Sequence, residues 1–345
     1  MSLFEHPHRR FNPLLNEWIL VSPNRTKRPW QGKIHEIKKT ESLGYNPDCY
    51  LCPGNRRDDG QTNPEYSATF VFKNDFSALY PDAPESHIDE CGLIKAKSEK
   101  GICRVICYSP RHDLTMPRMT GDAIKKVVDL WTDQYVELGG MKEIAYVQIF
   151  ENKGEQMGCS NPHPHGQIWA NERVPQVPAR ECATQKEYHS SKKKCLLCDY
   201  LALEQTKKER IVLENNSFVV LTPFWAVWPY EVMVLPKKHH TSLATLSNQE
   251  RFDLADALKR IGTRYDNLFS TSFPYSMGIH QKPTDGNDYP EWHLHLHFLP
   301  PLLRSATVQK FMVGYELLAM PQRDVTVELA ASKLREMGER HFLEK

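Results

Sequence analysis

His163-Pro164-His165-Gly166-Gln167 places two imidazoles two residues apart, with an amide side chain two residues further on. In an extended segment these three side chains point to the same face, because side chains alternate along a strand. One imidazole nitrogen could then attack a phosphorus atom while the amide holds the phosphoryl oxygens. Gly166 would let a ligand approach the main chain closely. An isolated pair of this kind could equally be two surface histidines beside a turn.

A polar segment rich in glycine precedes the histidine pair. It runs from Glu151 to Asn161 and follows Tyr146-Val147-Gln148-Ile149-Phe150, which reads as a strand. A loop of this composition can present backbone N–H groups to an anion. The spacing of the loop is a weak signal alone, and it gains weight from the imidazoles that follow.

The combined segment resembles the galactose-1-phosphate uridylyltransferase family, which belongs to the histidine-triad superfamily. The resemblance spans nearly the whole chain, in long and specific matches. Its parts are His8–Pro13, Arg25–Trp30, Asn74–Phe76, Gly158–Trp169, Arg264–Phe269 and Arg304–Glu316. It implies an α+β fold, in which mainly antiparallel strands form a large sheet and helices cover one side.

Composition limits the classes of protein that fit. The chain has 345 residues, enough for two domains or one duplicated unit, and a formal net charge of +1. This balance argues against a nucleic-acid or membrane-surface protein. No run of eighteen apolar residues and no signal-peptide core are present, so we expect a cytoplasmic protein. The nine cysteines then read as thiols or metal ligands rather than disulfides.

The chain reads as two copies of one unit. Each half contains, in order, a CxxC pair, two apolar runs, a proline followed by a histidine, an amphipathic helix, a strand and a His-x-His segment. The helices are expected at about 121–138 and after the capping-box pattern Ser247-Asn248-Gln249-Glu250. His293-Leu294-His295-Leu296-His297 alternates with a period of two, which predicts a half-buried strand with three imidazoles on one face.

The boundary between the copies is expected within the polar segment near 180–195. We assign residues 1–185 to an N-terminal histidine-triad-like half with the nucleophile and a zinc site. Residues 186–345 form a C-terminal half with a second metal site and a substrate-binding segment.

Two metal sites follow from the resemblance. The first is a zinc site of two thiolates and two imidazoles, which suit tetrahedral zinc. Its residues are Cys49, Cys52, His112 and His163. The second holds iron or zinc, and its ligand types do not decide which. Its residues are Glu181, His280, His295 and His297. The alternative to the first site is a pair of cysteines that bind no metal. The alternative to the second is a histidine strand that forms only a polar surface.

A third metal site is predicted from the duplication. Cys195 and Cys198 correspond to Cys49 and Cys52, His239 to His112, and His293 to His163. Four potential ligands in four equivalent places suggest an additional zinc site where better-known bacterial relatives typically have other residues. Exposed CxxC thiols without a metal remain the alternative.

The resemblance implies transfer of UMP between UDP-glucose and galactose 1-phosphate, through a uridylyl intermediate on His165. Gln167 cannot exchange a proton, which favours transfer over hydrolysis, and it can donate to the phosphoryl oxygens. The expected phosphate cradle is Asn152 with the turn Gly158, Cys159 and Ser160, in which Ser160 is a hydroxyl donor.

The remaining substrate contacts are also carried over from the family. Asn74 and Asp75 should meet the uracil or ribose, and Arg25 and Arg28 suit phosphate, although most such basic loops are only solvated. The residues expected at the hexose and phosphates are Lys310, Phe311, Met312, Val313, Tyr315, Glu316 and Gln322. The family also implies a homodimer whose second subunit completes the site.

Two other functions are alternatives to this interpretation of the sequence. A dinucleoside-polyphosphate phosphorylase of the same superfamily would share the histidine but not the segment from Lys310 to Glu316. A non-enzymatic zinc-dependent adaptor or nucleic-acid binder fits less well with the balanced charge and the imidazole pair beside a glycine-rich turn.

Overall fold

The computed structural model describes residues 3–27 and 43–344, whose strands form three sheets. The strands are β1 His8–Asn12, β2 Glu17–Val21, β3 Phe70–Lys73, β4 His87–Glu90, β5 Ile94–Lys97, β6 Gly101–Cys107, β7 Tyr146–Lys153, β8 His165–Asn171, β9 Ile211–Glu214, β10 Phe218–Leu221, β11 Val232–Pro236, β12 Tyr275–His280, β13 His295–Leu299 and β14 Gln322–Arg323. The α-helices are α1 Gly121–Gly139, α2 Gln176–Lys192, α3 Leu196–Lys207, α4 Asn248–Leu268, α5 Tyr315–Leu318 and α6 Val327–Glu336. Of these helices, none combines the length and apolar character that a membrane crossing requires.

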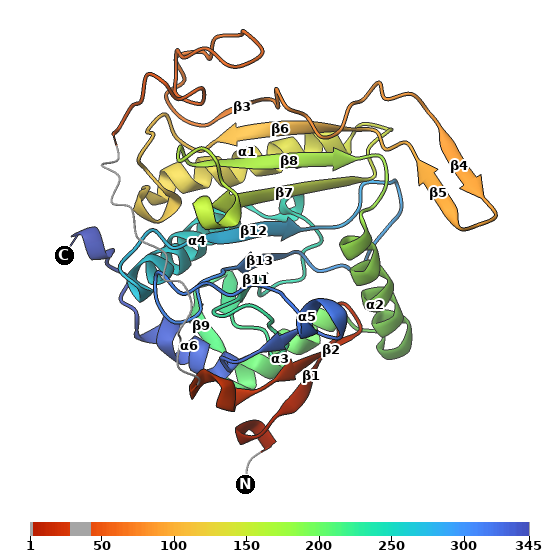
Figure 1. Cartoon of the computed structure of the whole chain (residues 1–345), viewed down its shortest axis with the longest axis vertical. Helices are drawn as coiled ribbons and strands as arrows, with labels where there is room; N and C mark the ends of the chain where they lie inside the picture. The colour runs from red at the N-terminus through yellow and green to blue at the C-terminus, as the bar shows by residue number, and fades with distance from the viewer. Residues whose placement is uncertain (1–2, 28–42, 345) are drawn as a thin grey trace.

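One antiparallel sheet dominates the molecule, with the strand order β3-β6-β8-β7-β12-β13-β11-β10-β9. Helices α1 and α4 lie behind this sheet in Figure 1 and pack against each other. Their buried side chains, such as Trp131 and Leu258, share one apolar core with every second residue of the central strands. This arrangement confirms the α+β class, with a large mainly antiparallel sheet and helices on one side.

Both long helices begin at side-chain caps. The Thr120 hydroxyl accepts a hydrogen bond from the Ala123 N–H at the start of α1. Ser247 and Glu250 form a complete capping box at the start of α4, as predicted. Helix α1 ends at Gly139, one residue beyond the predicted end.

The strand order shows the duplication. Read from one edge, β3-β6-β8-β7 is followed by β12-β13-β11-β10, which is the same sequence of strands in reverse. The two halves meet where β7 pairs with β12, and Phe150 lies opposite Gly278 in that pair. The sheet is therefore built around a pseudo-twofold axis through this pair of residues.

The strand register extends this symmetry to single residues. Phe150 pairs with Gln167 in the first half, and Gly278 pairs with His297 in the second. Gln167 and His297 thus hold equivalent places, and so do His165 and His295 two residues earlier. The histidine pair of each half lies on the sheet face that α1 and α4 leave open.

Other segments cover the two ends of that open face. The hairpin β1–β2 and helix α3 pack on β10 and β11, in an apolar cluster that includes Leu14, Leu197 and Trp225. The CxxC segment around Cys49 packs on β3 and β6 at the far end. Strand β14 runs parallel to β2. Neither of these two clusters, both formed by described residues, extends over the middle of the face.

Strand β7 is longer than expected. The sequence indicated a strand over 146–150 followed by a loop, whereas the strand continues to Lys153 because Glu151, Asn152 and Lys153 still pair with β12. Glu151 and Lys153 point to the helix face and are buried there, so polarity alone gave the wrong end for this strand. Asn152 is consequently a strand residue.

Candidate active site and metal clusters

The alternation along β8 decides which of its side chains face the open side. Ile168 and Ala170 belong to the core under α1 and α4, so His165, Gln167 and Trp169 point the other way. Gly166 also faces the core, where an added Cβ would collide with the Tyr108 hydroxyl. The expectation that Gly166 admits a ligand was therefore wrong, because this glycine makes room for a core tyrosine.

Two hydrogen bonds orient the reactive side chains. His165 Nδ1 donates to the His163 carbonyl at 2.8 Å, so Nε2 carries the lone pair. Trp169 Nε1 donates to Gln167 Oε1 at 3.3 Å, which leaves the amide N–H groups of Gln167 to donate elsewhere. Burial lowers the pKa of His165, and the ring is therefore neutral at pH 7. A neutral imidazole and an amide donor thus stand on one face of one strand.

The N-terminal cysteine–histidine cluster is buried next to His165. Potential ligand atoms of Cys49, Cys52, His112 and His163 all lie within 4.8 Å of one another. His163 Nε2 donates to the Ser109 carbonyl at 2.8 Å, so its Nδ1 faces the sulfur of Cys52 at 3.4 Å. This outer hydrogen bond is typical of metal-ligating histidines. The donor set fits zinc, and His163 links the cluster to the strand that carries His165.

The second cluster joins α2 to strands β12 and β13. Glu181, His280, His295 and His297 also place their ligand atoms within 4.8 Å. Glu181 Oε2 lies 2.9 Å from His280 Nδ1, and Oε1 lies 3.9 Å from His297 Nε2. The Nε2 atoms of His295 and His297 are buried, and neither forms a hydrogen bond with another described residue. His295 Nε2 lies 3.4 Å from Glu181 Oε2. Buried ring nitrogens that converge on a buried carboxylate without hydrogen bonds fit a bound cation.

This second cluster lies in the C-terminal half at the place that His165 and Gln167 hold in the N-terminal half. His295 is equivalent to His165, and His297 to Gln167, by the strand register given above. The same sheet position therefore carries a free imidazole in one half and a group of potential metal ligands in the other.

The third predicted set of ligands is also brought together. Ligand atoms of Cys195, Cys198, His239 and His293 lie within 4.8 Å of one another, in a setting more exposed than that of the first cluster.

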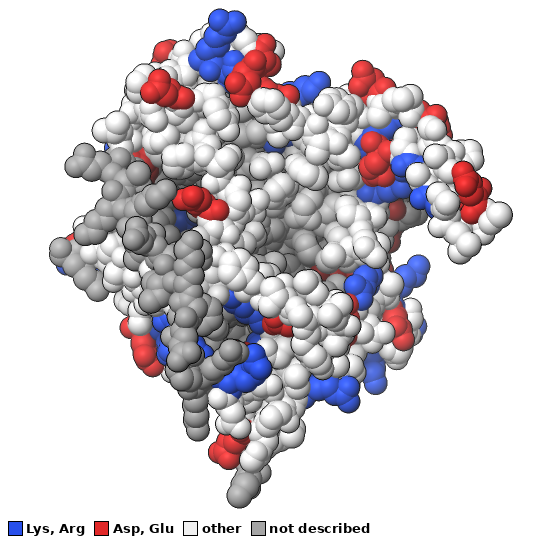
Figure 2. All heavy atoms as spheres, in the orientation of Figure 1, with Lys and Arg blue, Asp and Glu red and all other residues white. Residues whose placement is uncertain are grey.

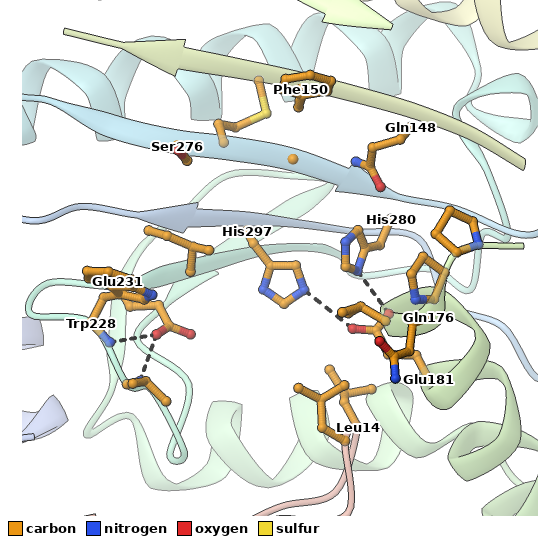
Figure 3. Close-up of a pocket in the computed structure, with 18 of the residues that line it drawn as sticks. Leu14, Gln148, Phe150, Gln176, Glu181, Trp228, Glu231, Ser276, His280 and His297 are labelled. Atoms are coloured by element: carbon orange, nitrogen blue, oxygen red, sulfur yellow. Dashed lines mark hydrogen bonds and ion pairs between the residues drawn. The ribbon is translucent and has the colours of Figure 1, made fainter. Parts of the chain in front are cut away.

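A cavity of about 710 Å³ opens on the uncovered middle of the sheet. Figure 3 shows His280 and His297 directed toward Glu181 on one side of it and Glu231 beside Trp228 on the other. Asn152 and Trp169 also line it, whereas His165 and Gln167 are not among its lining residues. In Figure 2 the centre of this face is hollowed and shows few charged side chains. The cavity thus lies over the pseudo-twofold axis, between the two half-sites.

The predicted phosphate cradle lies at the end of β7. Asn152 Oδ1 accepts a hydrogen bond from the Ser276 hydroxyl at 2.7 Å, which leaves its amide N–H groups available. A short 3-10 turn, Glu155–Met157, ends at Gly158, where φ is +77° and favours glycine. Ser160 beyond it is exposed, while the Cys159 thiol donates to the Asn161 carbonyl at 3.1 Å.

The C-terminal substrate segment contacts this turn. Gln309 Nε2 donates to the Gln156 carbonyl at 3.3 Å. Lys310 pairs with Glu316 at 2.6 Å and also donates to the Gln322 carbonyl. Three apolar side chains of the segment are more than half exposed: Phe311, Val313 and Tyr315. Met312 between them is half-buried.

An N-terminal arginine joins the same network. Arg25 Nε donates to Asp324 Oδ1 at 3.0 Å, and Gln322 Nε2 donates to the same oxygen at 2.6 Å. The structure therefore connects Arg25, near the N-terminus, with Gln322 and Lys310 in the C-terminal half. Arg28 lies outside the described residues.

Asn74 and Asp75 directly follow β3, which is an edge strand of the main sheet. Asn74 Oδ1 accepts from the Phe76 N–H at 3.0 Å, which forms a tight turn. Asp75 Oδ1 lies 3.3 Å from Arg57 Nη1, and burial raises the pKa of Asp75. No hydrogen bond or ion pair between the described residues joins this pair to the Lys310 segment.

A buried ionic network supports Asn152 from the helix face. Lys153 Nζ lies 2.9 Å from Asp266 Oδ1, and His341 Nε2 lies 3.1 Å from Asp266 Oδ2. Burial raises the pKa of the neighbouring Glu151 to about 7, and Tyr275 donates to this carboxyl at 3.3 Å. These groups fix the end of β7 at the position where the phosphate cradle begins.

Comparison with known proteins bears on this site. A sequence model of the galactose-1-phosphate uridyl transferase N-terminal domain matches residues 1–175, and the C-terminal domain of the same family matches residues 181–345. The chain belongs to the galactose-1-phosphate uridyl transferase family. The family resemblance and the assignment to the transferase enzymes are thereby confirmed.

Individual members of the family are similar along nearly their whole length. The galactose-1-phosphate uridylyltransferase of Haemophilus influenzae is 51% identical, over 99% of this chain and 97% of the relative. The protein of the same name from Rattus norvegicus is 48% identical, over 98% of this chain and 89% of the relative. A solved uridylyltransferase structure matches with a TM-score of 0.75 at 26% identity, covering 95% of this chain and 97% of that chain.

Several residues of the site were missed from the sequence. Trp169 orients Gln167, and Asp324 holds Arg25 against Gln322. The alternation from His165 could have placed Trp169 on the reactive face, since it is two residues beyond Gln167. No local pattern marks Asp324, because its partner Arg25 lies 299 residues away in the chain.

Proposed function

We propose that the chain exchanges UMP between UDP-glucose and galactose 1-phosphate by double displacement, with His165 as the nucleophile. The observation that carries this proposal is the geometry of β8. His165 Nδ1 is engaged by a backbone carbonyl, so Nε2 carries the lone pair on the open face beside Gln167. Membership of the family supports the choice of substrates, because the relatives from Haemophilus influenzae and Rattus norvegicus are named galactose-1-phosphate uridylyltransferases.

His165 forms a bond to phosphorus in the first step, and the same bond breaks in the second step. His165 Nε2 attacks the α-phosphorus of UDP-glucose, the bond from that phosphorus to the bridging oxygen breaks, and glucose 1-phosphate leaves with the electron pair. A uridylyl-histidine remains. A phosphate oxygen of galactose 1-phosphate then attacks the same phosphorus, the N–P bond breaks, and UDP-galactose forms. Because both leaving groups are sugar phosphates, neither step needs a strong driving force.

Amide and hydroxyl donors stabilise the charge on the transferred group. Gln167 N–H groups donate to the non-bridging oxygens, since Trp169 already engages Oε1. Asn152, Gly158, Cys159 and Ser160 form the phosphate cradle. Fixed donors of this kind favour the transition state without changing their protonation.

The sugar and nucleoside contacts are proposed for the residues carried over from the family. The network of Arg25, Lys310, Glu316 and Gln322 holds the sugar phosphate, and Asn74 and Asp75 contact the uridine. The exposed apolar side chains of Phe311, Val313 and Tyr315 support a homodimer in which a second copy covers this segment. The cytoplasmic location and the assignment of Arg28 stay predictions, as does the boundary at residue 185.

Zinc is the proposed ion at Cys49, Cys52, His112 and His163, where two thiolates and two imidazoles supply a closed structural site. Its role is to hold His163 and so fix the strand that bears His165. Iron or zinc is proposed at Glu181, His280, His295 and His297, a set of hard and borderline ligands that either ion accepts.

A labelling experiment tests the function. The protein is incubated with UDP-glucose labelled at the α-phosphorus and then denatured in alkali, which preserves an N–P bond. We expect about one label per chain on the peptide that contains His165. Added galactose 1-phosphate should release the label as UDP-galactose. Release by inorganic phosphate but not by galactose 1-phosphate would instead indicate a phosphorylase, and absence of label would contradict the covalent route.

Replacing Gln167 with histidine should lower uridylyl transfer and raise hydrolysis of UDP-glucose. The substitution removes the amide donor and introduces a titratable ring that can donate a proton to the leaving oxygen. Loss of one such donor costs about 10²- to 10³-fold in kcat. The measurement is a parallel assay of UDP-galactose formation and of glucose 1-phosphate release in the absence of galactose 1-phosphate. Unchanged transfer without hydrolysis would remove Gln167 from the mechanism.

A further inference from the structure

We propose that Cys195, Cys198, His239 and His293 bind a zinc ion that stabilises the C-terminal half and positions the ligands of the Glu181 cluster. This site is distinct from the nucleophile and from both clusters assigned above to the proposed function. It does not depend on the identity of the substrates.

The distances between ligand atoms match those around one tetrahedral ion. His293 Nδ1 lies 3.5 Å from Cys195 Sγ and 3.3 Å from Cys198 Sγ, and His239 Nδ1 lies 3.5 Å from Cys198 Sγ. Zinc bonds of about 2.3 Å to sulfur and 2.0–2.1 Å to nitrogen place a tetrahedral S–N pair about 3.5 Å apart. A simple thiol–imidazole hydrogen bond would bring one sulfur to one nitrogen, whereas here both sulfurs converge on His293.

The surroundings of the ligands have the form expected of a metal site. His293 Nε2 donates to the Pro236 carbonyl at 3.2 Å, so that Nδ1 faces the sulfurs. Cys195 caps helix α3, and its sulfur accepts from the Cys198 N–H at 3.4 Å, which favours the thiolate. The rings of His239 and His293 lie 5.2 Å apart at 80°, close to the 5.4 Å and 84° of His112 and His163.

The site connects helix α3 to the ends of two neighbouring strands of the main sheet, β11 and β13. Cys195 and Cys198 begin helix α3, His239 follows β11, and His293 precedes β13. The His293 N–H donates to Gln185 Oε1 at 3.1 Å, and Gln185 lies on α2 one turn after Glu181. The His293 carbonyl accepts from His295 Nδ1 at 2.7 Å. An ion that fixes His293 therefore also fixes the helix and the strand that supply Glu181 and His295.

Differential alkylation tests occupancy in the unmodified protein. The purified protein is treated with iodoacetamide before and after chelation, and the modified peptides are quantified by mass spectrometry. Cys195 and Cys198 should be protected until the chelator is added, because their sulfurs are bound to the ion. Cys91, which is exposed and outside all three clusters, is the internal control and should react equally in both samples. Equal reactivity of Cys198 and Cys91 before chelation would overturn the proposal.

Metal content provides a second and independent measurement. The double variant Cys195→Ser, Cys198→Ser should lose about one zinc ion per chain, as expected for one closed site. Its melting temperature should fall by several degrees, because binding of a structural ion is coupled to folding. The matched control Cys91→Ser should keep both values. Unchanged zinc content in the double variant would overturn the proposal. If the double variant fails to fold, the zinc content of the single variant His239→Ala replaces it as the test, because His239 is the exposed ligand of the set. Unchanged zinc content in that variant would likewise overturn the proposal.

Discussion

Replacing His165 with glycine is expected to abolish uridylyl transfer while the fold and the metal content stay intact. His165 is the only histidine on the open face of β8 with its Nε2 free, because His163 faces the cysteines of the first cluster. Removal of a covalent nucleophile lowers kcat by about 10⁴-fold or more. The measurement is the rate of UDP-galactose formation, together with the label retained on the protein from UDP-glucose.

Two controls separate the loss of the nucleophile from a loss of structure. His6 is exposed and outside the clusters, and His6→Ala should keep full activity. Free imidazole should restore part of the phosphorus chemistry to His165→Gly, because the small residue leaves room for it. Near-normal turnover of His165→Gly without added imidazole would show that another residue forms the intermediate.

Replacing Asp266 with alanine is expected to cause a large loss of stability. The Asp266 carboxylate is buried, and it accepts from Lys153 at 2.9 Å, from His341 at 3.1 Å and from the Phe273 N–H at 2.8 Å. Its removal leaves Lys153 as a buried charge without its partner. Breaking a buried ion pair in this way costs about 3–5 kcal/mol of unfolding free energy. Denaturant unfolding of the variant and the parent protein measures the difference.

The pH dependence gives this prediction a second readout. Burial raises the pKa of Asp266, but Lys153 and His341 outweigh it and hold the pKa below its usual value. The contribution is therefore present above the unfolded pKa of about 3.9 and is lost as the pH falls through the folded value. Asp129→Ala is the matched control, since Asp129 pairs with Lys125 on a partly exposed helix face. That variant should lose less than about 1 kcal/mol. Equal losses in the two variants would contradict a special role for Asp266.

The sequence carried enough information for the sheet, the long helices and the three ligand sets. Alternating histidines and leucines predicted the facing of β13, and the capping box of Ser247 predicted where α4 begins. The CxxC pairs indicated the geometry because cysteines three residues apart at the start of a turn can present both sulfurs to one point. These features depend on residues that are close together in the chain or repeated in both halves.

Contacts between distant segments could not be predicted in the same way. Lys153 looked like part of a polar loop, and only its buried partner Asp266, 113 residues away, explains why β7 continues to that residue. The repeat aligned the two His-x-His segments, but the pseudo-twofold axis that relates His165 to His295 is visible only in the strand register across the sheet. Gly166 was misread because its neighbour Tyr108 comes from the segment that directly follows β6, 58 residues earlier in the chain.

The pairing of β2 with β14 has a consequence for the order of synthesis. Leu20 and Ser22 N–H groups donate to the carbonyls of Pro321 and Arg323, and Arg10 pairs with Glu328 at 2.8 Å. The ribosome completes the hairpin about 300 residues before these partners, which at about 5–20 residues per second is a delay on the order of tens of seconds. During this interval the edge of β2 has unsatisfied backbone groups that can pair with other chains. We therefore expect nascent chains that end before Gln322 to depend most on chaperones.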